Sequence, residues 1–273
     1  MYGYWNTRLP SLGDGLLYHF TSSSSLFKIL ESMSLKLSSF ENLNDLNEKE
    51  VNLYGVDFLK SAEVEEFILG RCRLLSFSRN FPNSKSVELG YRKPRMWAQY
   101  GDNHAGACIA INESKFVKEN KEILSSCFNK IRNVKYVNWA YSDLNNSLVE
   151  LPAHEFVVKY FNKLFFEKYK DWRHEDERRL FLIGEVDFLS INNCVEFVVL
   201  GSKFSSENEI CRVLEDSISR AGKQILIPHD FRKASNSGGG INSIDWAHRI
   251  LEEVEKRKMN SISYLKYLNS NGY

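Results

Sequence analysis

Short apolar runs recur along the chain, each about as long as one β-strand and each bounded by polar turn formers. They lie at residues 16–20, 35–40, 73–78, 106–111, 134–139, 180–183, 197–201 and 224–227. Helix-patterned stretches separate several of these runs. The clearest covers residues 154–169, where Phe156, Tyr160, Leu164 and Phe165 form one apolar stripe. This succession of strand and helix patterns predicts an α+β fold with a mixed β-sheet and flanking helices.

The length and the distribution of polar segments predict one domain and a tail. With 273 residues, 43% of them hydrophobic and 26% charged, the chain can bury a sizeable core and keep a polar surface. A helical pattern over 207–221 precedes the last apolar run and predicts a terminal β-α-β unit. Serines and glycines over 235–240 indicate a linker, and a charged helical pattern follows. We therefore expect a single α+β domain over 1–234 and a linker with a helical C-terminal tail over 235–273.

Several classes of protein are disfavoured by composition. The net charge of +1 provides no global field that would attract nucleic acid or anionic lipid. No apolar run approaches eighteen residues and no signal peptide is visible, so we expect a cytoplasmic protein without a membrane partner. The five cysteines include no CxxC pair, and the six histidines form neither HxxxH nor HExxH. Neither a disulfide framework nor a metal site is expected.

Polar residues at the end of the first apolar run form the first candidate site. His19 and Thr21 lie in the sequence Tyr-His-Phe-Thr, where a histidine at a strand end can hold a ligand hydroxyl beside a threonine. A core histidine followed by a helix-capping threonine fits the same pattern.

An aromatic pair forms the second candidate site. Trp97 and Tyr100 are three residues apart, so a helix would present them on one face, just before the apolar run at 106–111. Aromatic side chains in such a place can stack on a planar base or a nicotinamide ring, an interaction worth about 1–3 kcal/mol when measured for bases. Ordinary packing of a helix on a sheet also explains the pair.

A cluster of charges at the entry to the most apolar run forms the third candidate site. Strand alternation would place Glu175, Glu177 and Arg179 on one face, and Asp176 and Arg178 on the other. Two carboxylates that share a cleft repel each other, so one pKa should rise unless an arginine compensates. A solvated ion-pair cluster, worth about 0–1 kcal/mol, is the alternative. No GxxxxGK[ST], GxGxxG or GxSxG motif is present.

Five motifs in fixed order resemble the domain-of-unknown-function family 2971. They are LYHFTS at 17–22, LNDLNE at 43–48, LSFS at 75–78, MWAQYGDNHAG at 96–106 and WRHEDERRL at 172–180. The resemblance covers about residues 16–230. More distantly, the layout is similar to ADP-ribosyltransferases of the histidine-tyrosine-glutamate type, which implies a twisted, split mixed sheet.

The resemblance to these transferases implies roles for the first two candidate sites. His19 and Thr21 would hold the adenosine ribose of NAD. Tyr100, or alternatively Trp97, would stack on the nicotinamide. By spacing alone, two further tyrosines compete for this middle position: Tyr91 and Tyr136.

The same resemblance implies roles for the charged cluster. Glu177, with Glu175 as the alternative, would bind the nicotinamide ribose and stabilise the cation that forms when the glycosidic bond breaks. The other glutamate would orient or deprotonate the acceptor. Arg178 or Arg179 would hold the pyrophosphate.

Three functional hypotheses follow. The leading one is an NAD-consuming ADP-ribosyltransferase that needs no metal and modifies a macromolecule, nucleic acid or protein, as a toxin or phage-defence effector with an antitoxin or defence partner. The second is a catalytically silent nucleotide-sensing or binding module. The third is a nuclease or phosphotransferase that would use Glu175 and Glu177 with a divalent metal.

Overall fold

The structure, a computed structural model, describes residues 15–43, 58–82, 87–138, 151–204 and 225–228. Its strands are β1 (Leu16–Thr21), β2 (Ser34–Lys36), β3 (Cys72–Arg79), β4 (Phe81–Pro82), β5 (Val87–Glu88), β6 (Ala107–Asn112), β7 (Phe128–Asn133), β8 (Lys135–Val137), β9 (Glu167–Tyr169), β10 (Glu177–Ile183), β11 (Phe188–Ser190), β12 (Val195–Leu200) and β13 (Ile225–Pro228). Its α-helices are α1 (Ser23–Ser32), α3 (Phe58–Arg71), α4 (Pro94–Gln99), α5 (Glu113–Glu119), α6 (Lys121–Ser126) and α7 (Ala153–Phe166). Three 3-10 helices are η1 (Phe40–Asn42), η2 (Gly90–Arg92) and η3 (Lys170–Glu175). The helix, linker and tail expected over 207–221 and 235–273 lie outside the described residues.

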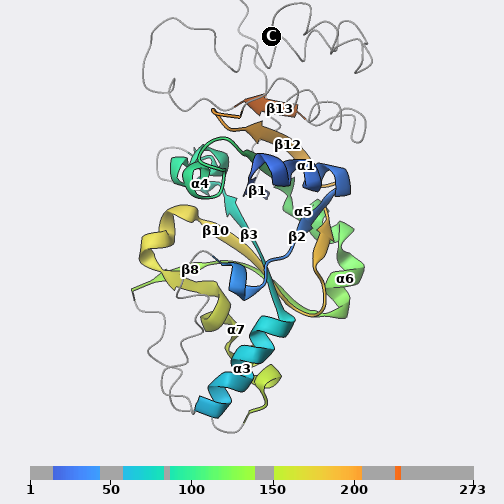
Figure 1. The fold of residues 1–273 in the computed structure, drawn as a ribbon, viewed down its shortest axis with the longest axis vertical. Coiled ribbons are helices and arrows are strands. Elements are labelled where there is room, and N and C mark those ends of the chain that lie inside the picture. Colours follow the sequence, from blue (N-terminus) through green and yellow to red (C-terminus); the bar gives the residue numbers. More distant parts are fainter. Residues whose placement is uncertain (1–14, 44–57, 83–86, 139–150, 205–224, 229–273) are drawn as a thin grey trace, which may run out of the picture.

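A seven-stranded sheet in the order β13-β12-β6-β1-β3-β10-β7 forms the centre of the fold (Figure 1). Every neighbouring pair in it is antiparallel except β12 and β13, which are parallel. The expected α+β class with a mixed sheet is therefore confirmed. Three two-stranded pairs, β11-β2, β4-β5 and β8-β9, complete the sheet structure of the described residues.

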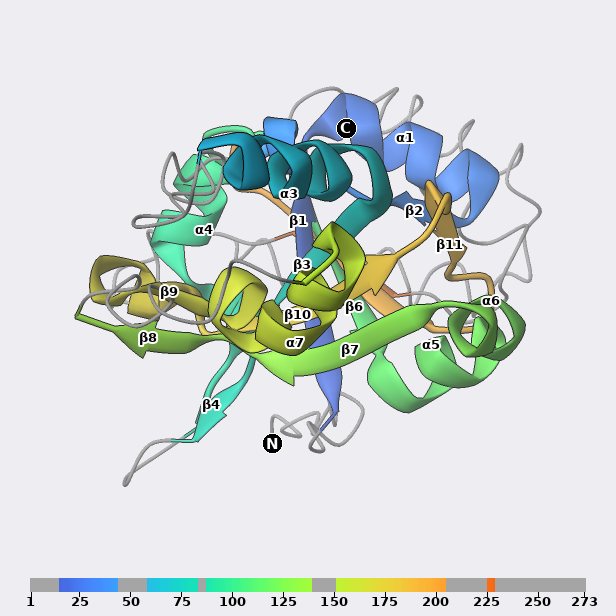
Figure 2. The same cartoon turned by 90° about the horizontal axis from the view of Figure 1, so that it is seen from below.

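Helices cover both faces of this sheet, because side chains alternate along each strand. On β10, Leu180 and Leu182 belong to the core under α1, α5 and α6, whereas Phe181 belongs to the core under α3 and α7. Helices α3 and α7 lie side by side at one end of the molecule (Figures 1 and 2). A third cluster packs α4 and η2 on β1, with Tyr18 and Trp97 fully buried in it.

The sheet contains a split between β1 and β3. Strand β1 pairs with β6 at six successive positions but with β3 at only two, Leu17 with Arg79 and Tyr18 with Ser78. Nearer the start of β3, Ser38 lies on the side of the strand that faces β1 and forms an isolated antiparallel β-bridge with Leu74. Between these two contacts, no strand of the described residues lies beside the backbone of β3 on the β1 side. The expected split in the sheet is thus located.

The edge strand β7 was not expected from the sequence. The predicted strand at 134–139 corresponds to β8, whereas residues 128–133 carry the polar sequence FNKIRN and show no clean apolar alternation. Lys130 and Arg132 lie with their charges over the rings of Phe128 and Phe161, respectively. No residue of β7 is buried; Phe128 and Ile131 are half-buried against the cores on opposite faces of the sheet, and the polar residues between them hide this pattern in the sequence.

Candidate functional site

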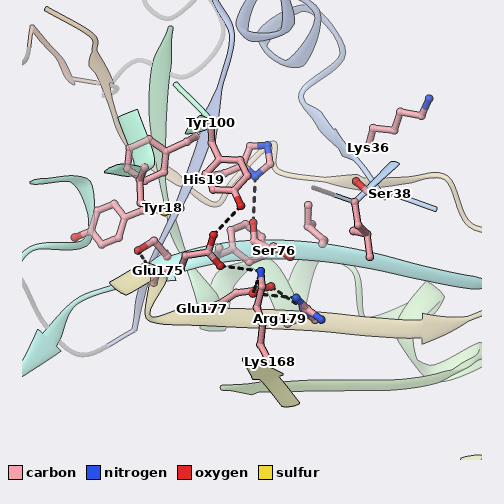
Figure 3. Close-up of a pocket in the computed structure, with 16 residues that line it drawn as sticks. Tyr18, His19, Lys36, Ser38, Ser76, Tyr100, Lys168, Glu175, Glu177 and Arg179 are labelled. Atoms are coloured by element: carbon pink, nitrogen blue, oxygen red, sulfur yellow. Dashed lines mark hydrogen bonds and ion pairs between the residues drawn. The ribbon is translucent and has the colours of Figure 1, made fainter. Parts of the chain in front are cut away.

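The split exposes one residue in the middle of the sheet. Ser76 is exposed although its neighbours Leu75 and Phe77 are 3% exposed and β3 is an internal strand. The ring of His19 reaches across the split from β1, with Nδ1 3.4 Å from the carbonyl oxygen of Ser76 (Figure 3). A side chain therefore stands where a ladder hydrogen bond between the strands would otherwise form.

A pocket of about 250 Å³ opens at this split. Its lining combines residues of β1, β2, β3, β9, β10, α4 and η3 with residues that follow β2, η1 and α4. They are Tyr18, His19, Phe20, Lys36, Ser38, Leu43, Leu75, Ser76, Phe77, Ser78, Met96, Tyr100, Lys168, Glu175, Glu177 and Arg179. Most of the apolar members come from the sheet. Lys168, Glu175, Glu177 and Arg179 gather at the start of β10, whereas Lys36 lies apart from them (Figure 3). The pocket therefore joins an apolar floor to a dense group of ionisable side chains.

A sharp backbone corner presents the two glutamates. Glu175 ends η3, Asp176 adopts a left-handed conformation with φ of 44°, and Glu177 begins β10. Ser78 Oγ and Lys93 Nζ donate to the carbonyl oxygen of Glu175 at 2.7 and 3.0 Å. Lys93 also forms an ion pair with Asp176 at 2.6 Å. The sequence pattern predicted Glu175 as part of the strand. In the structure Glu175 lies before β10, and the corner at Asp176 directs its side chain into the pocket.

Glu177 is held by a two-pronged contact with Arg179. The Nε and Nη2 atoms of Arg179 donate to the two carboxylate oxygens at 2.6 and 2.9 Å, and both residues are at most 4% exposed. Lys168 adds a cation at 3.6 Å. Burial by itself would raise the pKa of Glu177, but the charges of Arg179 and Lys168 outweigh it and lower the pKa to about 2. Glu177 is therefore ionised throughout the physiological range.

Glu175 has a different environment. The hydroxyl of Tyr100 donates to one carboxylate oxygen at 2.7 Å, and Lys168 Nζ donates to the other at 2.9 Å (Figure 3). Burial raises the pKa of Glu175, and the nearby charge of Glu177 raises it further, while Lys168 and Tyr100 oppose this shift. The two carboxylates thus differ: one is firmly ionised, and the other has its pKa shifted toward neutrality.

The surroundings of His19 also define its protonation state and its tautomer. Burial lowers its pKa, so the imidazole is neutral at pH 7. With Nδ1 directed at the carbonyl oxygen of Ser76, that nitrogen carries the proton. The lone pair is then on Nε2, which can accept a hydrogen bond from a ligand hydroxyl.

Five predicted site residues line the pocket together: His19, Tyr100, Glu175, Glu177 and Arg179. The roles assigned to them stay predictions. The role of Arg179 as a pyrophosphate ligand is disfavoured, because the residue is 1% exposed and its guanidinium donates to Glu177 and, through Nη1, to the carbonyl oxygen of Phe165 at 2.8 Å. Its contacts identify it as the partner of Glu177.

Three predicted site residues are not brought to the pocket. Trp97 is fully buried, meets Phe20 edge-on and donates its Nε1 hydrogen to the carbonyl oxygen of Tyr91 at 2.7 Å, so it cannot stack on a ligand. Arg178 lies on the opposite face of the sheet and binds Glu113. Thr21 is 7% exposed and is not part of the lining.

Two residues have contacts in the site that the sequence did not predict. Lys168 was expected inside the helix over 154–169, but α7 ends at Phe166 and Lys168 belongs to β9. Because the neighbouring sequence is rich in lysine and glutamate, no feature of the sequence distinguishes Lys168 from a lysine exposed to solvent. Tyr136, considered only as a ring that stacks on nicotinamide, instead accepts the backbone N–H of Glu177 through its hydroxyl at 2.9 Å.

One family model aligns with this part of the chain. The model of DUF2971, a protein of unknown function, matches residues 96–180. The matched stretch runs from α4 to the first half of β10, and it contains Tyr100, Lys168, Glu175 and Glu177 but not His19. The similarity to DUF2971 therefore supports the expected family and coincides with the polar side of the pocket. No curated protein matches the chain.

Neither a metal-binding cluster nor a membrane-spanning helix is found among the described residues. Among them, no group of three or more histidine, cysteine, aspartate or glutamate side chains could hold a metal ion. Within the same ranges, no helix is both long and apolar enough to cross a membrane.

Proposed function

We propose that the pocket binds the nicotinamide ribose half of NAD and that the protein is an ADP-ribosyltransferase. The observation that carries this proposal is the meeting of His19, Tyr100 and the two glutamates at the split between β1 and β3. These residues supply a hydroxyl acceptor, an aromatic ring and carboxylates, the groups needed to hold a ribosyl ring and to stabilise positive charge on it.

The reaction would break one bond and form one. The bond between nicotinamide and ribose breaks, and nicotinamide leaves with the electron pair as a neutral molecule. The ribosyl carbon becomes positively charged, and the ionised carboxylate of Glu177 stabilises it. A hydroxyl or amine of the acceptor then bonds to that carbon, and its proton passes to Glu175. A base is most effective when its pKa lies near the working pH, which suits Glu175 better than Glu177.

The size of the pocket limits how much of NAD it encloses. Cavities for drug-sized ligands measure about 300–1,000 Å³, whereas this one measures about 250 Å³. One ribose with its nicotinamide would fit, and the adenosine half would lie outside it. This differs from the sequence-based expectation that His19 contacts the adenosine ribose: in this arrangement Nε2 of His19 would bind the nicotinamide ribose.

The macromolecular acceptor would be a nucleic acid or a protein, as expected of a toxin or phage-defence effector. A second candidate function is a silent nucleotide-binding module. It is favoured by the Arg179–Glu177 contact, because an arginine that occupies both carboxylate oxygens already neutralises the charge that a ribosyl cation would need.

NAD turnover separates the two functions. The wild-type protein should release nicotinamide from NAD, and Glu177→Gln should lower the rate by about 10²–10³, the usual cost of losing one group that stabilises transition-state charge. Glu185→Gln, at a carboxylate that is 76% exposed and remote from the pocket lining, is the matched control and should keep the wild-type rate. A silent module would show no release, but NAD at a hundredfold excess over its Kd would stabilise it by about 2.7 kcal/mol. If NAD is neither consumed nor bound, both functions are rejected.

A further inference from the structure

Lys168 is a buried cation placed between two carboxylates. It comes from β9, a three-residue strand between α7 and η3 that pairs in parallel with β8. Its side chain is 5% exposed, and its Nζ lies 2.9 Å from Glu175 Oε2 and 3.6 Å from Glu177 Oε2. The ring of Trp172 lies beneath the ammonium group, 4.6 Å away at its centroid. A lysine enclosed in this way is fixed in position and poorly solvated.

The two carboxylates depend on Lys168 to different degrees. Glu177 keeps two hydrogen bonds from Arg179 if the lysine is removed. Glu175 would keep a hydrogen bond from the neutral phenol of Tyr100 and would still lie beside the negative charge of Glu177. The carboxylate of Glu175 is thus the one whose charge depends on Lys168.

The remaining charged groups around Glu175 reinforce this asymmetry. From the segments packed against it, the titratable and charged groups are Tyr100 after α4, Tyr136 on β8, Lys93 before α4, Asp176 at the corner, Lys168 on β9, and Glu177 and Arg179 on β10. Lys93 is already paired with Asp176, and its contact with Glu175 is to the backbone carbonyl. Arg179 is directed at Glu177. Neither Lys93 nor Arg179 therefore replaces the contact that Lys168 makes with the carboxylate of Glu175.

We propose that Lys168 is a positioning residue that keeps Glu175 ionised and aimed into the pocket, so that Glu175 accepts the proton of the acceptor. This inference rests on the proposed transferase activity for its catalytic meaning, but the ionisation it asserts is a property of the unliganded protein. The opposing effects on the pKa of Glu175, raised by burial and by Glu177 and lowered by Lys168, agree with it.

The first test measures the ionisation of Glu175 directly. Infrared difference spectra of wild type minus Glu175→Gln isolate the carboxylate and carboxylic acid bands of this residue across a pH titration. We expect the carboxylate band at pH 7. In Lys168→Gln, which keeps a donor but removes the charge, the midpoint should move up by about one to three pH units, the range typical of an opposite charge within about 4–6 Å. Lys168→Arg should stay near the wild-type midpoint, as should the exposed control Lys170→Gln.

The second test asks whether the same shift governs activity. The rising limb of the pH–kcat profile should move with the infrared midpoint in Lys168→Gln, whereas a lysine of purely structural importance would lower kcat equally at all pH values. An unshifted midpoint in Lys168→Gln overturns the inference. A carboxylic acid band for Glu175 in the wild type at pH 7 also overturns the inference. This result needs only the wild type and Glu175→Gln, so it holds even if Lys168→Gln does not fold. A wild-type protein that releases no nicotinamide, yet shows the expected bands, would refute the transferase and leave the ionisation of Glu175 as proposed.

Discussion

Replacing Glu177 by glutamine isolates the energetic contribution of the charge pair inside the pocket. Glutamine has nearly the same shape as glutamate, so no cavity forms, but Arg179, a residue that is 1% exposed, loses the counter-charge of its guanidinium. Removing one partner of a buried pair costs about 3–5 kcal/mol. The lowered pKa of Glu177 gives a second figure for the same free energy. A fall from 4.5 to about 2, at about 1.4 kcal/mol per pKa unit, corresponds to about 3 kcal/mol of folding stability.

The sign of the pH dependence follows from the direction of this shift. Because the folded protein binds the proton of Glu177 less tightly than the unfolded chain does, the stabilisation is complete above pH 4.5 and is lost as the pH falls through about 2. Wild type should therefore lose about 3 kcal/mol over this range from Glu177, and Glu177→Gln should not. The difference in stability between the two proteins should be largest at pH 7 and should shrink at pH 3.

Urea unfolding followed by tryptophan fluorescence measures this difference, since Trp97 is fully buried in the folded state. Glu185→Gln, which removes an exposed carboxylate, should change stability by at most about 1 kcal/mol at either pH. The reasoning is refuted if Glu177→Gln loses the same amount at pH 7 and pH 3, because the cost would then come from packing and not from charge. A loss no larger than that of the control at pH 7 would show that the pair contributes nothing measurable.

Three further predictions concern residues that do not line the pocket. Trp97→Ala should destabilise the protein by about 3–5 kcal/mol in urea unfolding, as expected when a fully buried tryptophan is truncated; a loss below about 1 kcal/mol would contradict its core position. Arg178→Gln should leave the rate of nicotinamide release unchanged, since Arg178 binds Glu113 on the opposite face of the sheet; a large fall in the rate would restore its role as a phosphate ligand. Gly90→Ala should cost about 1–3 kcal/mol, because the added Cβ would lie 2.3 Å from the buried ring of Tyr18; a thermal melt equal to that of the wild type would contradict it.

The sequence could locate residues of the site wherever a regular period governs side-chain direction. Strand alternation along β10 placed Glu177 and Arg179 on one face and Arg178 on the other, and the contacts of all three agree with it. Such a rule needs no knowledge of the neighbouring strands, because successive side chains of any strand point in opposite directions.

Predictions from the helical period were wrong where a helix ended earlier than its apolar pattern in the sequence. Trp97 and Tyr100 were expected on one helix face, but α4 ends at Gln99, and Tyr100, with φ of −119° and ψ of −16°, turns toward the pocket while Trp97 stays in the core. Lys168 was missed for the same reason, since α7 ends at Phe166 and the chain continues as β9. Helix ends depend on tertiary contacts that a local pattern does not contain.

The backbone corner between η3 and β10 links the stability of the fold to the chemistry of the pocket. A left-handed conformation at a residue other than glycine costs on the order of 1–3 kcal/mol and persists only where surrounding contacts enforce it. At Asp176 these contacts are the ion pair with Lys93 and the bonds that Lys93 and Ser78 make to the carbonyl oxygen of Glu175. Because the same contacts fix the direction of the Glu175 side chain, the energy spent on the strained corner places a carboxylate in the pocket before any ligand binds. A carboxylate that is already oriented needs no reorganisation when charge develops on a substrate, and such preorganised groups give the largest electrostatic stabilisation of a transition state.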